Sequence, residues 1–560
     1  MSENKGSLMK RLFWGILLAA LLHVNPALSQ SLVSEYKSYS SLTGELKKLA
    51  AQFPDIIHLQ SLGQTVQKRD LWLTTLGADA ATQKPALFIA GGLEGPDVAS
   101  SDVCLRFLKN MALQYGRVDS ITELLRRVDF YVAPRVNPDA SEQLWRPLKY
   151  DRFLNARSLD LDHDGAVDED GYDDMNGDGL ISLMRVSNPS GQWMADPLDS
   201  QLVRKADPAQ HQVGVYKIMP EGRDNDGDGR WNEDEAGGVD VNRNFSYRYK
   251  FFQSGAGDYP VSEVESRAVA DFLFEHENIV VVFSFSTASN LLTPWESRKS
   301  EQNRVIDAVL PQDAPYFKFV AEQYKNIFGD AGSEASPPPP GDLCEWAYYH
   351  YGRWSFNAPV WTPPEIQCKD STKTAPEKDV LAGQRKLLHW LQHEHVENAV
   401  VAWQKIDHPD FPDATVEVGG FAPGVKYNPP ADSIDAVGKR YMRFFQQLAD
   451  DVPTLDVQVT VDARDKGLYG ITAAVKNSGY LPTNSRLGAQ SQWVKKVKTE
   501  LVASEQVAII SGTRFYFSDQ INGGSAVELT WLVAGKEGQT VTIKTASPGA
   551  GFAEKTVALK

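Results

Sequence analysis

The sequence predicts an α/β fold, in which helices cover both faces of a sheet, followed by a smaller all-β unit. From residue 34 to about residue 403, helical patterns alternate with short apolar runs. The run at 279–285 carries no charge and is rich in β-branched residues, which is typical of a strand buried on both faces. After about residue 455 the helical patterns give way to short strands separated by turn residues. The two textures indicate two kinds of folding unit.

The elements of the first region follow in order. Leu42, Leu46 and Leu49 have helical spacing, and Pro54 lies just beyond them. Helices are also expected at 98–115 and 260–275. Strands are expected at 70–76, 86–90, 128–132 and 279–285.

The second region predicts a small β-sandwich, with strands at 457–461, 468–475, 506–510, 526–533 and 539–544. We therefore divide the chain into a signal segment at 1–29, an α/β domain at 30–405, a connector at 406–450 and a β-sandwich at 451–560. The α/β domain contains an acidic insertion at about 155–236, and the connector ends in a helix at 436–449.

The composition limits the kind of partner. The chain has 560 residues, of which 42% are hydrophobic, so it can bury a large core. With 57 basic and 73 acidic residues it carries a net charge of −16, which disfavours nucleic acid as a partner. Three cysteines cannot build a disulfide framework, although an oxidising compartment would permit Cys344 and Cys368 to pair.

The N-terminus predicts export. Lys5, Lys10 and Arg11 precede an apolar run at 12–24, and small residues follow at 27–29. This is the pattern of a cleaved secretory signal, so we expect a secreted or periplasmic protein. The alternative is an uncleaved membrane anchor. No later segment of the sequence reaches the roughly 20 apolar residues of a membrane span.

Three acidic, glycine-containing loops predict structural calcium. In the loop at 224–235, oxygen-bearing side chains alternate, a glycine permits a sharp turn, and a carboxylate stands at the twelfth position. Its candidate ligands are Asp224, Asp226, Asp228, Asn232 and Glu235. Two weaker loops offer Asp160, Asp162 and Asp164, and Asp174, Asn176 and Asp178, without a carboxylate at the twelfth position. The alternative is a solvated acidic loop without an ion.

Several motifs occur in the order of a known family. They are Asn-Pro-Asp-Ala at 137–140, Gly-Val-Asp-Val-Asn-Arg-Asn-Phe at 238–245, Ser-Asn-Leu-Leu at 289–292 and Glu-Trp-Ala-Tyr at 345–348. With these motifs, residues 31–405 resemble the zinc carboxypeptidases, the carboxypeptidase A-like metallopeptidases. The resemblance implies a mixed, mostly parallel sheet of eight strands flanked by helices. It also implies zinc-dependent release of C-terminal amino acids from peptides.

The metal positions depart from the family pattern. By resemblance, Glu94 stands where the family has its first histidine ligand, Asp97 where it has glutamate, and Ser286 where it has its second histidine. Catalytic zinc sites are usually built from imidazole or thiolate with at most one carboxylate. Two carboxylates and a hydroxyl therefore make a poor zinc site and would at best hold a harder cation.

Of the other catalytic positions, one departs from the family pattern and the others resemble it. Pro359 stands where the family has its catalytic glutamate, and proline cannot accept a proton; Glu365 is the nearest substitute. Arg146 resembles the arginine that polarises the substrate carbonyl. Asn242 and Arg243 match the pair that grips the terminal carboxylate of the peptide, which suits a planar guanidinium. The alternative for Arg243 is a structural salt bridge.

These residues predict an exported, catalytically degenerate member of the family that binds peptide C-terminal carboxylates, including cell-wall peptide ends, in the former active site. Two alternatives remain open. One is an active metallocarboxypeptidase with an atypical metal site. The other is a cell-surface structural protein whose β-sandwich makes the contacts.

Overall fold

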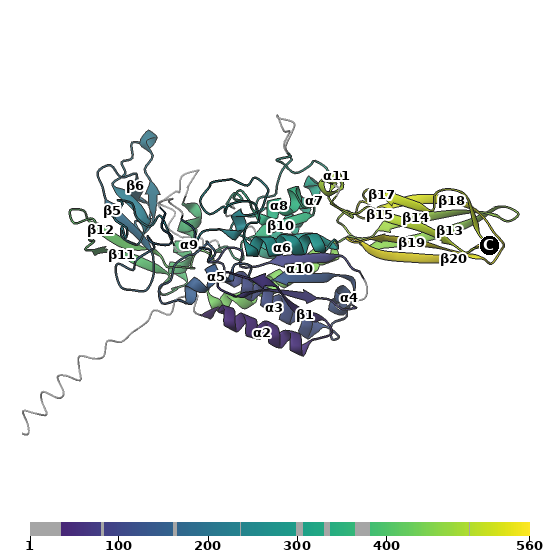
Figure 1. Ribbon diagram of the computed structural model, residues 1–560, viewed down its shortest axis with the longest axis horizontal. Coiled ribbons are helices and arrows are strands. Elements are labelled where there is room, and N and C mark those ends of the chain that lie inside the picture. The colour runs from purple at the N-terminus through teal and green to yellow at the C-terminus, as the bar shows by residue number, and fades with distance from the viewer. Residues whose placement is uncertain are drawn as a thin grey trace, which may run out of the picture.

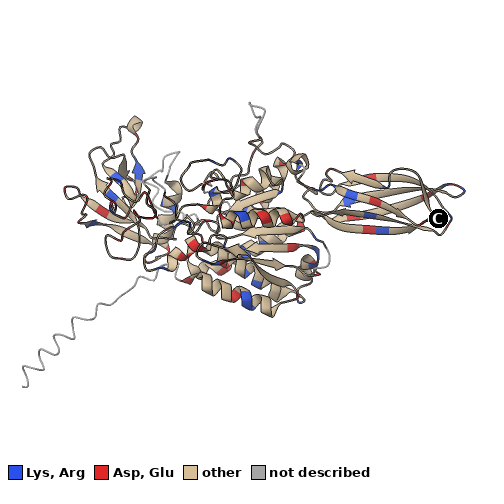
Figure 2. Ribbon diagram, viewed as in Figure 1, with Lys and Arg blue, Asp and Glu red and all other residues tan. Residues whose placement is uncertain are grey.

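The computed structural model describes residues 35–79, 83–160, 165–235, 237–297, 306–329, 336–364, 381–491 and 493–560. Several sequence-based predictions fall outside these ranges: the signal segment at 1–29, Asp162, Asp164, Glu365 and Cys368. Figure 1 shows three parts in a row, with a separate sheet on the left, the main domain in the centre and the C-terminal strands on the right. Acidic and basic residues are interspersed over all three (Figure 2).

The main domain is built on a mixed sheet with the strand order β1-β2-β4-β3-β9-β10. β1 and β2 are antiparallel to their neighbours, whereas β4, β3, β9 and β10 run parallel. The strands are β1 Ile57–Gln64, β2 Asp70–Leu76, β3 Ala86–Ala90, β4 Asp129–Ala133, β9 Ile279–Phe285 and β10 Trp354–Ala358. All four strands predicted for this region are present. The described residues contain six strands of this sheet, not the eight that the family resemblance implies.

Helices cover both faces of the sheet, as the alternating pattern predicted. Every residue of β3 and β9 is buried, because side chains on both faces of these strands pack under helices. One face lies under α2 Tyr39–Gln52, α3 Ala99–Gln114, α4 Asp119–Arg127, α7 Ala314–Phe328 and α10 Ile434–Asp450. The other lies under α6 Val264–Glu275 and α8 Leu343–Tyr349.

The acidic insertion contains more regular structure than the sequence indicated. Its strands join two strands from residues 400–421 in an antiparallel sheet with the order β11-β12-β5-β8-β6-β7. These are β5 Leu183–Ser187, β6 Trp193–Ala195, β7 Val203–Lys205, β8 Tyr216–Pro220, β11 Val400–Ile406 and β12 Val416–Phe421. We call this the insertion sheet. Helix α9 Ala382–His393 packs beside it.

The expectation that 406–450 is a connector is wrong in detail. This stretch supplies β12 to the insertion sheet and α10 to the main core. The predicted helix at 436–449 is confirmed as α10, which buries Tyr441, Phe444 and Phe445 against the main sheet. An amphipathic helix with such a broad apolar face needs a core to bury it, so it ends the main domain.

The C-terminal β-domain consists of two four-stranded antiparallel sheets that share one apolar cluster. The first has the order β13-β14-β18-β16 and the second β17-β15-β19-β20. The strands are β13 Leu455–Asp465, β14 Leu468–Asn477, β15 Val497–Ala503, β16 Ala508–Ser511, β17 Phe515–Ser518, β18 Ala526–Ala534, β19 Thr540–Ser547 and β20 Gly551–Ala558. Buried and exposed residues alternate along β14 and β19, as the sequence predicted for strands with one face in a core.

A loop of the β-domain anchors it to the main domain. The short helix α11, Arg486–Ser491, begins where the backbone N–H groups of Arg486 and Leu487 donate to the buried carboxylate of Asp313, at 2.8 and 3.2 Å. Tyr348 donates to the same carboxylate at 2.9 Å. Tyr480 stacks on Phe319, with ring centroids 3.7 Å apart. Within the described ranges, none of the helices combines the length and the apolar character that crossing a membrane requires.

Candidate functional site

The residues that we predict to stand at the family's metal and general-base positions meet at one edge of the main sheet, where the parallel strands β3, β9 and β10 end. Glu94 follows β3 after a short loop, Ser286 follows β9 directly, and Pro359 follows β10 directly. The Ser286 N–H donates to the Ala358 carbonyl at 3.1 Å, which sets Ser286 beside Pro359. Ligand sites of α/β sheets usually lie at this carboxyl edge of the strands.

The loop between β3 and α3 is held in a fixed shape. Gly92 has a φ of +55°, which favours glycine, and a Cβ at Gly95 would lie 2.2 Å from the Arg152 carbonyl oxygen. Asn428, which is distant in the sequence, holds the end of this loop by hydrogen bonds. Its Oδ1 accepts from the Val98 and Ala99 N–H groups, and its Nδ2 donates to the Pro96 carbonyl at 2.8 Å.

Glu94 is buried and surrounded by neutral hydrogen-bond donors. Its Oε1 accepts from the Ser286 hydroxyl at 2.8 Å and from the Thr287 N–H at 3.2 Å. The Asn242 amide approaches the same oxygen at 3.5 Å. Burial raises the pKa of Glu94, and these hydrogen bonds oppose that shift. Glu94 and Ser286, the predicted first and third metal positions, are therefore hydrogen-bonded to each other.

Asp97 is used in the helix that follows it. Its Oδ1 accepts from the Ser100 N–H at 3.0 Å, and the Ser100 hydroxyl donates to the Asp97 carbonyl at 3.0 Å. Asp97 thus satisfies a free N–H group at the start of α3. Burial raises its pKa to about 7, with a further contribution from the nearby Glu94 carboxylate.

The residues at these positions do not fit zinc. The set contains no imidazole or thiolate, the Glu94 carboxylate is engaged by Ser286 and Thr287, and Asp97 caps a helix. Among the described residues, the acidic oxygens that converge as metal ligands belong to Asp224, Asp226 and Asp228 instead. We therefore derive no reaction step that uses zinc at this edge of the sheet.

The structure offers no general base at the family's position. Pro359 has no titratable group, and its carbonyl accepts from the Tyr441 hydroxyl at 2.7 Å. Glu365, the substitute predicted from the sequence, lies outside the described residues. Arg146 is exposed, and its Nη2 donates to Gln67 at 3.1 Å, so it stays a prediction as a substrate contact.

Asn242 and Arg243 lie on one short 3₁₀ turn, Val241–Arg243, with different surroundings. Asn242 is buried. Its Nδ2 lies 3.2 Å from the Asp342 carboxylate and 3.4 Å from the Ser286 hydroxyl, and its Oδ1 accepts from the Leu343 N–H. Arg243 is half-buried, and the described residues make no hydrogen bond or ion pair with its guanidinium. The prediction that both side chains grip a ligand therefore applies to Arg243, because the Asn242 amide is already engaged.

Two more carboxyl groups surround this turn. Asp240 precedes Asn242 and accepts from its N–H at 2.9 Å, and Asp342 caps α8 by accepting from the Glu345 N–H at 2.9 Å. Burial raises the pKa of Asp240 and of Asp342 to about 7, and repulsion from Glu94 adds to both shifts. No ion pair to either carboxyl group occurs within the described part of the chain.

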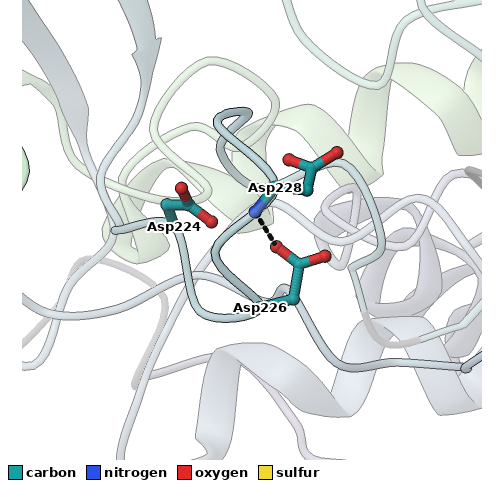
Figure 3. Close-up of side chains that lie close together, drawn as sticks. All are labelled: Asp224, Asp226 and Asp228. Atoms are coloured by element: carbon teal, nitrogen blue, oxygen red, sulfur yellow. Dashed lines mark hydrogen bonds between the residues drawn. The ribbon is translucent and has the colours of Figure 1, made fainter.

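The acidic loop at 224–235 brings three carboxylates together (Figure 3). One oxygen from each of Asp224, Asp226 and Asp228 lies within 4.8 Å of the others. Backbone N–H groups hold this shape: Gly227 and Gly229 donate to Asp224, and Asp228 donates to Asp226 at 3.1 Å, the bond dashed in Figure 3. Asp226 and Asp228 are exposed.

Other predicted calcium ligands lie elsewhere. Glu235 is paired with Tyr172 near Arg152, and burial raises its pKa. The Nδ2 of Asn232 donates to the Pro220 carbonyl at 3.1 Å. Asp160 accepts from the Gly165 N–H, and Asp178 accepts from the Asn176 amide at 3.0 Å. Asp174 accepts from the Gly177 and Gly179 N–H groups.

The two loops that begin at Asp160 and Asp224 are paired with each other. Asp170 and Asp234, which are equivalent in the two loops, form an isolated antiparallel bridge. The Asp168 N–H donates to Asp234, and the Asn232 N–H donates to Asp170. This reciprocal pairing could not be predicted from loop spacing alone.

Comparisons with known proteins agree with this architecture. The zinc carboxypeptidase family model matches residues 42–163 and 184–369, more than half of the chain. This α/β protein, with its candidate site at the carboxyl edge of a mixed sheet, belongs to the zinc carboxypeptidase family. Residues 456–558 match a domain of unknown function (DUF8731).

Individual relatives are distant. Rat carboxypeptidase B2 is 21% identical over 347 residues, which cover 60% of this chain and 64% of that protein. Human carboxypeptidase B is 29% identical over 116 residues, 21% of this chain and 28% of that protein. The chain thus spans less than two thirds of the length of these curated relatives.

Solved structures are similar only at low scores. The crystal structure of thrombin activatable fibrinolysis inhibitor has a TM-score of 0.39 at 16% identity, covering 76% of this chain and 77% of that one. A metallo-carboxypeptidase from Burkholderia cenocepacia has a TM-score of 0.29 at 13% identity, covering 58% and 60%. We draw no conclusion from scores this low.

Sequence reasoning missed several residues of the site. Asp342, Thr287 and Asn428 contact the former metal positions or their loop, yet none belongs to a motif that names a ligand. Asp342 could have been found as the N-cap before the 345–348 motif, because aspartate three residues before a glutamate is a helix-start signal. No local signal marks Asn428, which lies 330 residues from the N–H that it caps.

Proposed function

We propose that this protein is a catalytically inactive member of the zinc carboxypeptidase family that binds the C-terminal carboxylate of peptides at Arg243. One observation carries the proposal: the half-buried guanidinium makes no hydrogen bond or ion pair with the described residues, although it lies near enough to Asp240 to lower the pKa of that carboxyl group. A guanidinium whose hydrogen-bond donors are unused suits the planar, two-oxygen geometry of a carboxylate.

The loss of catalysis follows from substitutions of two kinds, at the metal positions and at the position of the general base. Glu94 and Ser286 occupy metal positions without an imidazole, and Pro359 cannot act as a general base. In this proposal Asn242 is a positioning residue. Its buried amide fixes the 3₁₀ turn to α8 through Asp342 and Leu343, and so holds Arg243 in place.

Export and the choice of peptide also belong to the proposal. The basic residues and apolar run at 5–24 support a signal segment, and exported peptides or cell-wall peptide ends are the ligands that fit this location. Mass spectrometry of the mature N-terminus tests export. Cleavage near residue 29 would support it.

The binding test compares two forms of one peptide. An N-acetylated peptide with a free C-terminus should bind in calorimetry, and its C-terminally amidated form should not, because only the free form offers a carboxylate. Arg243→Gln should abolish the difference. Arg117→Gln, which changes an exposed arginine between α3 and α4, should leave binding intact. Equal binding of both peptide forms would contradict the proposal.

Family membership favours one competing function, a working metallocarboxypeptidase with an atypical metal site. Incubating the same peptide with the protein in zinc, manganese or calcium distinguishes the two. Chelator-sensitive release of the C-terminal residue would refute the inactive assignment, whereas an intact peptide that binds through Arg243 supports it.

We also propose that the loop at 224–235 binds calcium. The convergent oxygens of Asp224, Asp226 and Asp228 support this, since calcium prefers several oxygen ligands. The ion would stiffen the paired loops beside the insertion sheet and take no part in chemistry.

A further inference from the structure

A groove of about 810 Å³ lies at the junction of the β-domain and the main domain, away from the family site. Its walls are α11, the outer face of the sheet β17-β15-β19-β20 and the segment 494–498. Figure 1 shows α11 next to the ends of β15 and β17 at this junction. A groove of this size has room for several residues of an extended peptide.

One wall of the groove is fixed in place, because α11 is hydrogen-bonded to the main domain. Asp313 accepts from two N–H groups of α11, and the Ser485 hydroxyl donates to the Gly352 carbonyl at 3.0 Å. The backbones touch closely here: a Cβ at Gly488 would lie 2.3 Å from the Gly352 oxygen. Substitution there would push the domains apart, so the close approach requires glycine.

The groove is basic within an acidic chain. Arg486, Lys495, Lys496 and Lys498 line it, with Asp519 as the acidic lining residue. Lys496 pairs with Asp519 at 2.6 Å, Lys495 with Glu277 at 3.4 Å and Lys498 with Glu500 at 3.8 Å. The lysine of each pair is exposed, so each pair contributes little and can be exchanged for a carboxylate of a ligand. In a chain with a net charge of −16, this local charge favours an acidic ligand.

The outer face of the same sheet presents aromatic surface. Strand register sets Phe517, Lys498, Ala546 and Phe552 in one row across β17, β15, β19 and β20. Phe517 is 62% exposed and Phe552 is 52% exposed. Exposed aromatic rings beside positive charge are typical of surfaces that bind a partner.

The edge of this sheet favours a polypeptide. β17 is the last strand of its sheet. The Leu501 N–H donates to the Arg514 carbonyl at 3.0 Å, so Leu501 and Arg514 form a hydrogen-bonded pair of the antiparallel ladder. Because such pairs alternate, the N–H and C=O of Phe517 point away from β15, to the open edge. Only a polypeptide can continue this ladder.

We propose that this groove binds an extended, acidic peptide segment that pairs with the edge of β17 and places its carboxylates against Lys496 and Lys498. Apolar side chains of the peptide pack on Phe517. The site is independent of the carboxylate site at Arg243, since neither the charge nor the edge strand requires a free C-terminus.

The test uses a fluorescent peptide of alternating Glu and Val, acetylated and amidated so that it offers no terminal carboxylate. Fluorescence anisotropy should show saturable binding that weakens in high salt. Lys498→Glu should weaken binding by about tenfold or more, which corresponds to about 1.4 kcal/mol. Lys544→Glu is the matched control, because Lys544 lies on the same face and outside the groove.

A second pair of variants tests the edge strand. Phe517→Pro removes the outward N–H without breaking a bond to β15, so it should weaken binding more than Phe517→Ala, which removes only the ring. Equal binding by the Lys498 and Lys544 variants would overturn the proposal. So would tight binding of polygalacturonate with no binding of the peptide, since the ligand would then be an acidic polysaccharide. If Phe517→Pro does not fold, the lysine variants still decide the outcome.

Discussion

Two acidic regions of this protein place their carboxylates in opposite surroundings. At the sheet edge, Glu94 and Asp97, which we predict to stand at family ligand positions, are buried and hydrogen-bonded to Ser286, Thr287 and Ser100. In the loop at 224–235, exposed carboxylates converge and are shaped by backbone N–H groups, which leave other oxygens open. Both regions are rich in carboxylates. They differ in whether those carboxylates are buried or exposed to water.

Burial among neutral hydrogen-bond donors favours the protonated form of a carboxyl group over the charged form. Removing a carboxylate from water raises its pKa, and for Asp97 and Asp240 this effect exceeds the opposing attraction of Arg135 and Arg243. The carboxylates of an exposed cluster instead stay in contact with water and can gain a cation at a small cost in desolvation. Each of the following tests changes one side of this contrast.

The largest expected effect comes from rebuilding the family residues at the sheet edge. Glu94→His, Asp97→Glu and Ser286→His together supply the ligand set that zinc prefers, so the triple variant should take up one zinc per chain. It should remain nearly inactive on peptides, because Pro359 gives no general base. Adding Pro359→Glu should raise the rate by about 10²–10⁴-fold.

Metal content by mass spectrometry and peptide release measure these steps. The unmodified protein, after mild chelation and zinc addition, is the control and should hold no tightly bound zinc. If the triple variant alone releases C-terminal residues efficiently, Glu365 becomes the candidate base and the position assigned to Pro359 is wrong.

The second largest expected effect is stabilisation of the protein by calcium at the loop 224–235. If the loop binds calcium in the folded state alone, the free energy of unfolding should rise by about 2.7 kcal/mol at a hundredfold excess of calcium over Kd. Asp226→Ala should remove this response, because it deletes one of the three convergent carboxylates. Asp462→Ala changes an exposed acid of the β-domain and serves as the control.

Thermal melts with calcium and with chelator provide the measurement. An identical melting temperature in both would show that the loop is a solvated acidic turn. If calcium still stabilised the Asp226→Ala variant, the ion would bind at a site other than this loop.

Much of the central fold could be predicted because its signals are local. The strands at 86–90 and 279–285 are uncharged apolar runs, and α2 shows Leu42, Leu46 and Leu49 on one face. The family motifs added the order of the site residues, and the family assignment is confirmed.

The insertion sheet could not be predicted, because it pairs strands that are far apart in the chain. Val186 of β5 lies opposite Val416 of β12, a partner 230 residues away. Its strands are also short and only partly buried, so their alternation is weak. In the β-domain the same reasoning missed β15 and β20, where charged residues interrupt the apolar pattern, and β17, which is only four residues long.

The sequence singled out Glu94, Ser286 and Asn242 as site residues, and the structure brings the three together. Their role stays a prediction, and their hydrogen bonds depend on how the strand ends and a 3₁₀ turn meet. Whether the Asn242 amide is free or engaged depends on Asp342, which lies 100 residues further along the chain. Spacing within a motif carries no information about such contacts.

The smallest expected effect is a pH dependence at the sheet edge. The pKa of Asp342 is raised from 3.8 to about 7, so between these values the folded state holds a proton that the unfolded state releases. The free energy of unfolding should therefore fall as pH rises from about 4 to about 7, by up to about 1.4 kcal/mol per pH unit for this group. Asp342→Asn keeps a side-chain oxygen that caps α8 and removes the titration, so it should flatten this slope.

Denaturant titrations across this pH range measure the slope. They are done in chelator so that the loop at 224–235 binds no ion, with Asp462→Asn as the control. Equal slopes in both variants would mean that Asp342 is ionised in the folded protein and that its neighbours stabilise its charge.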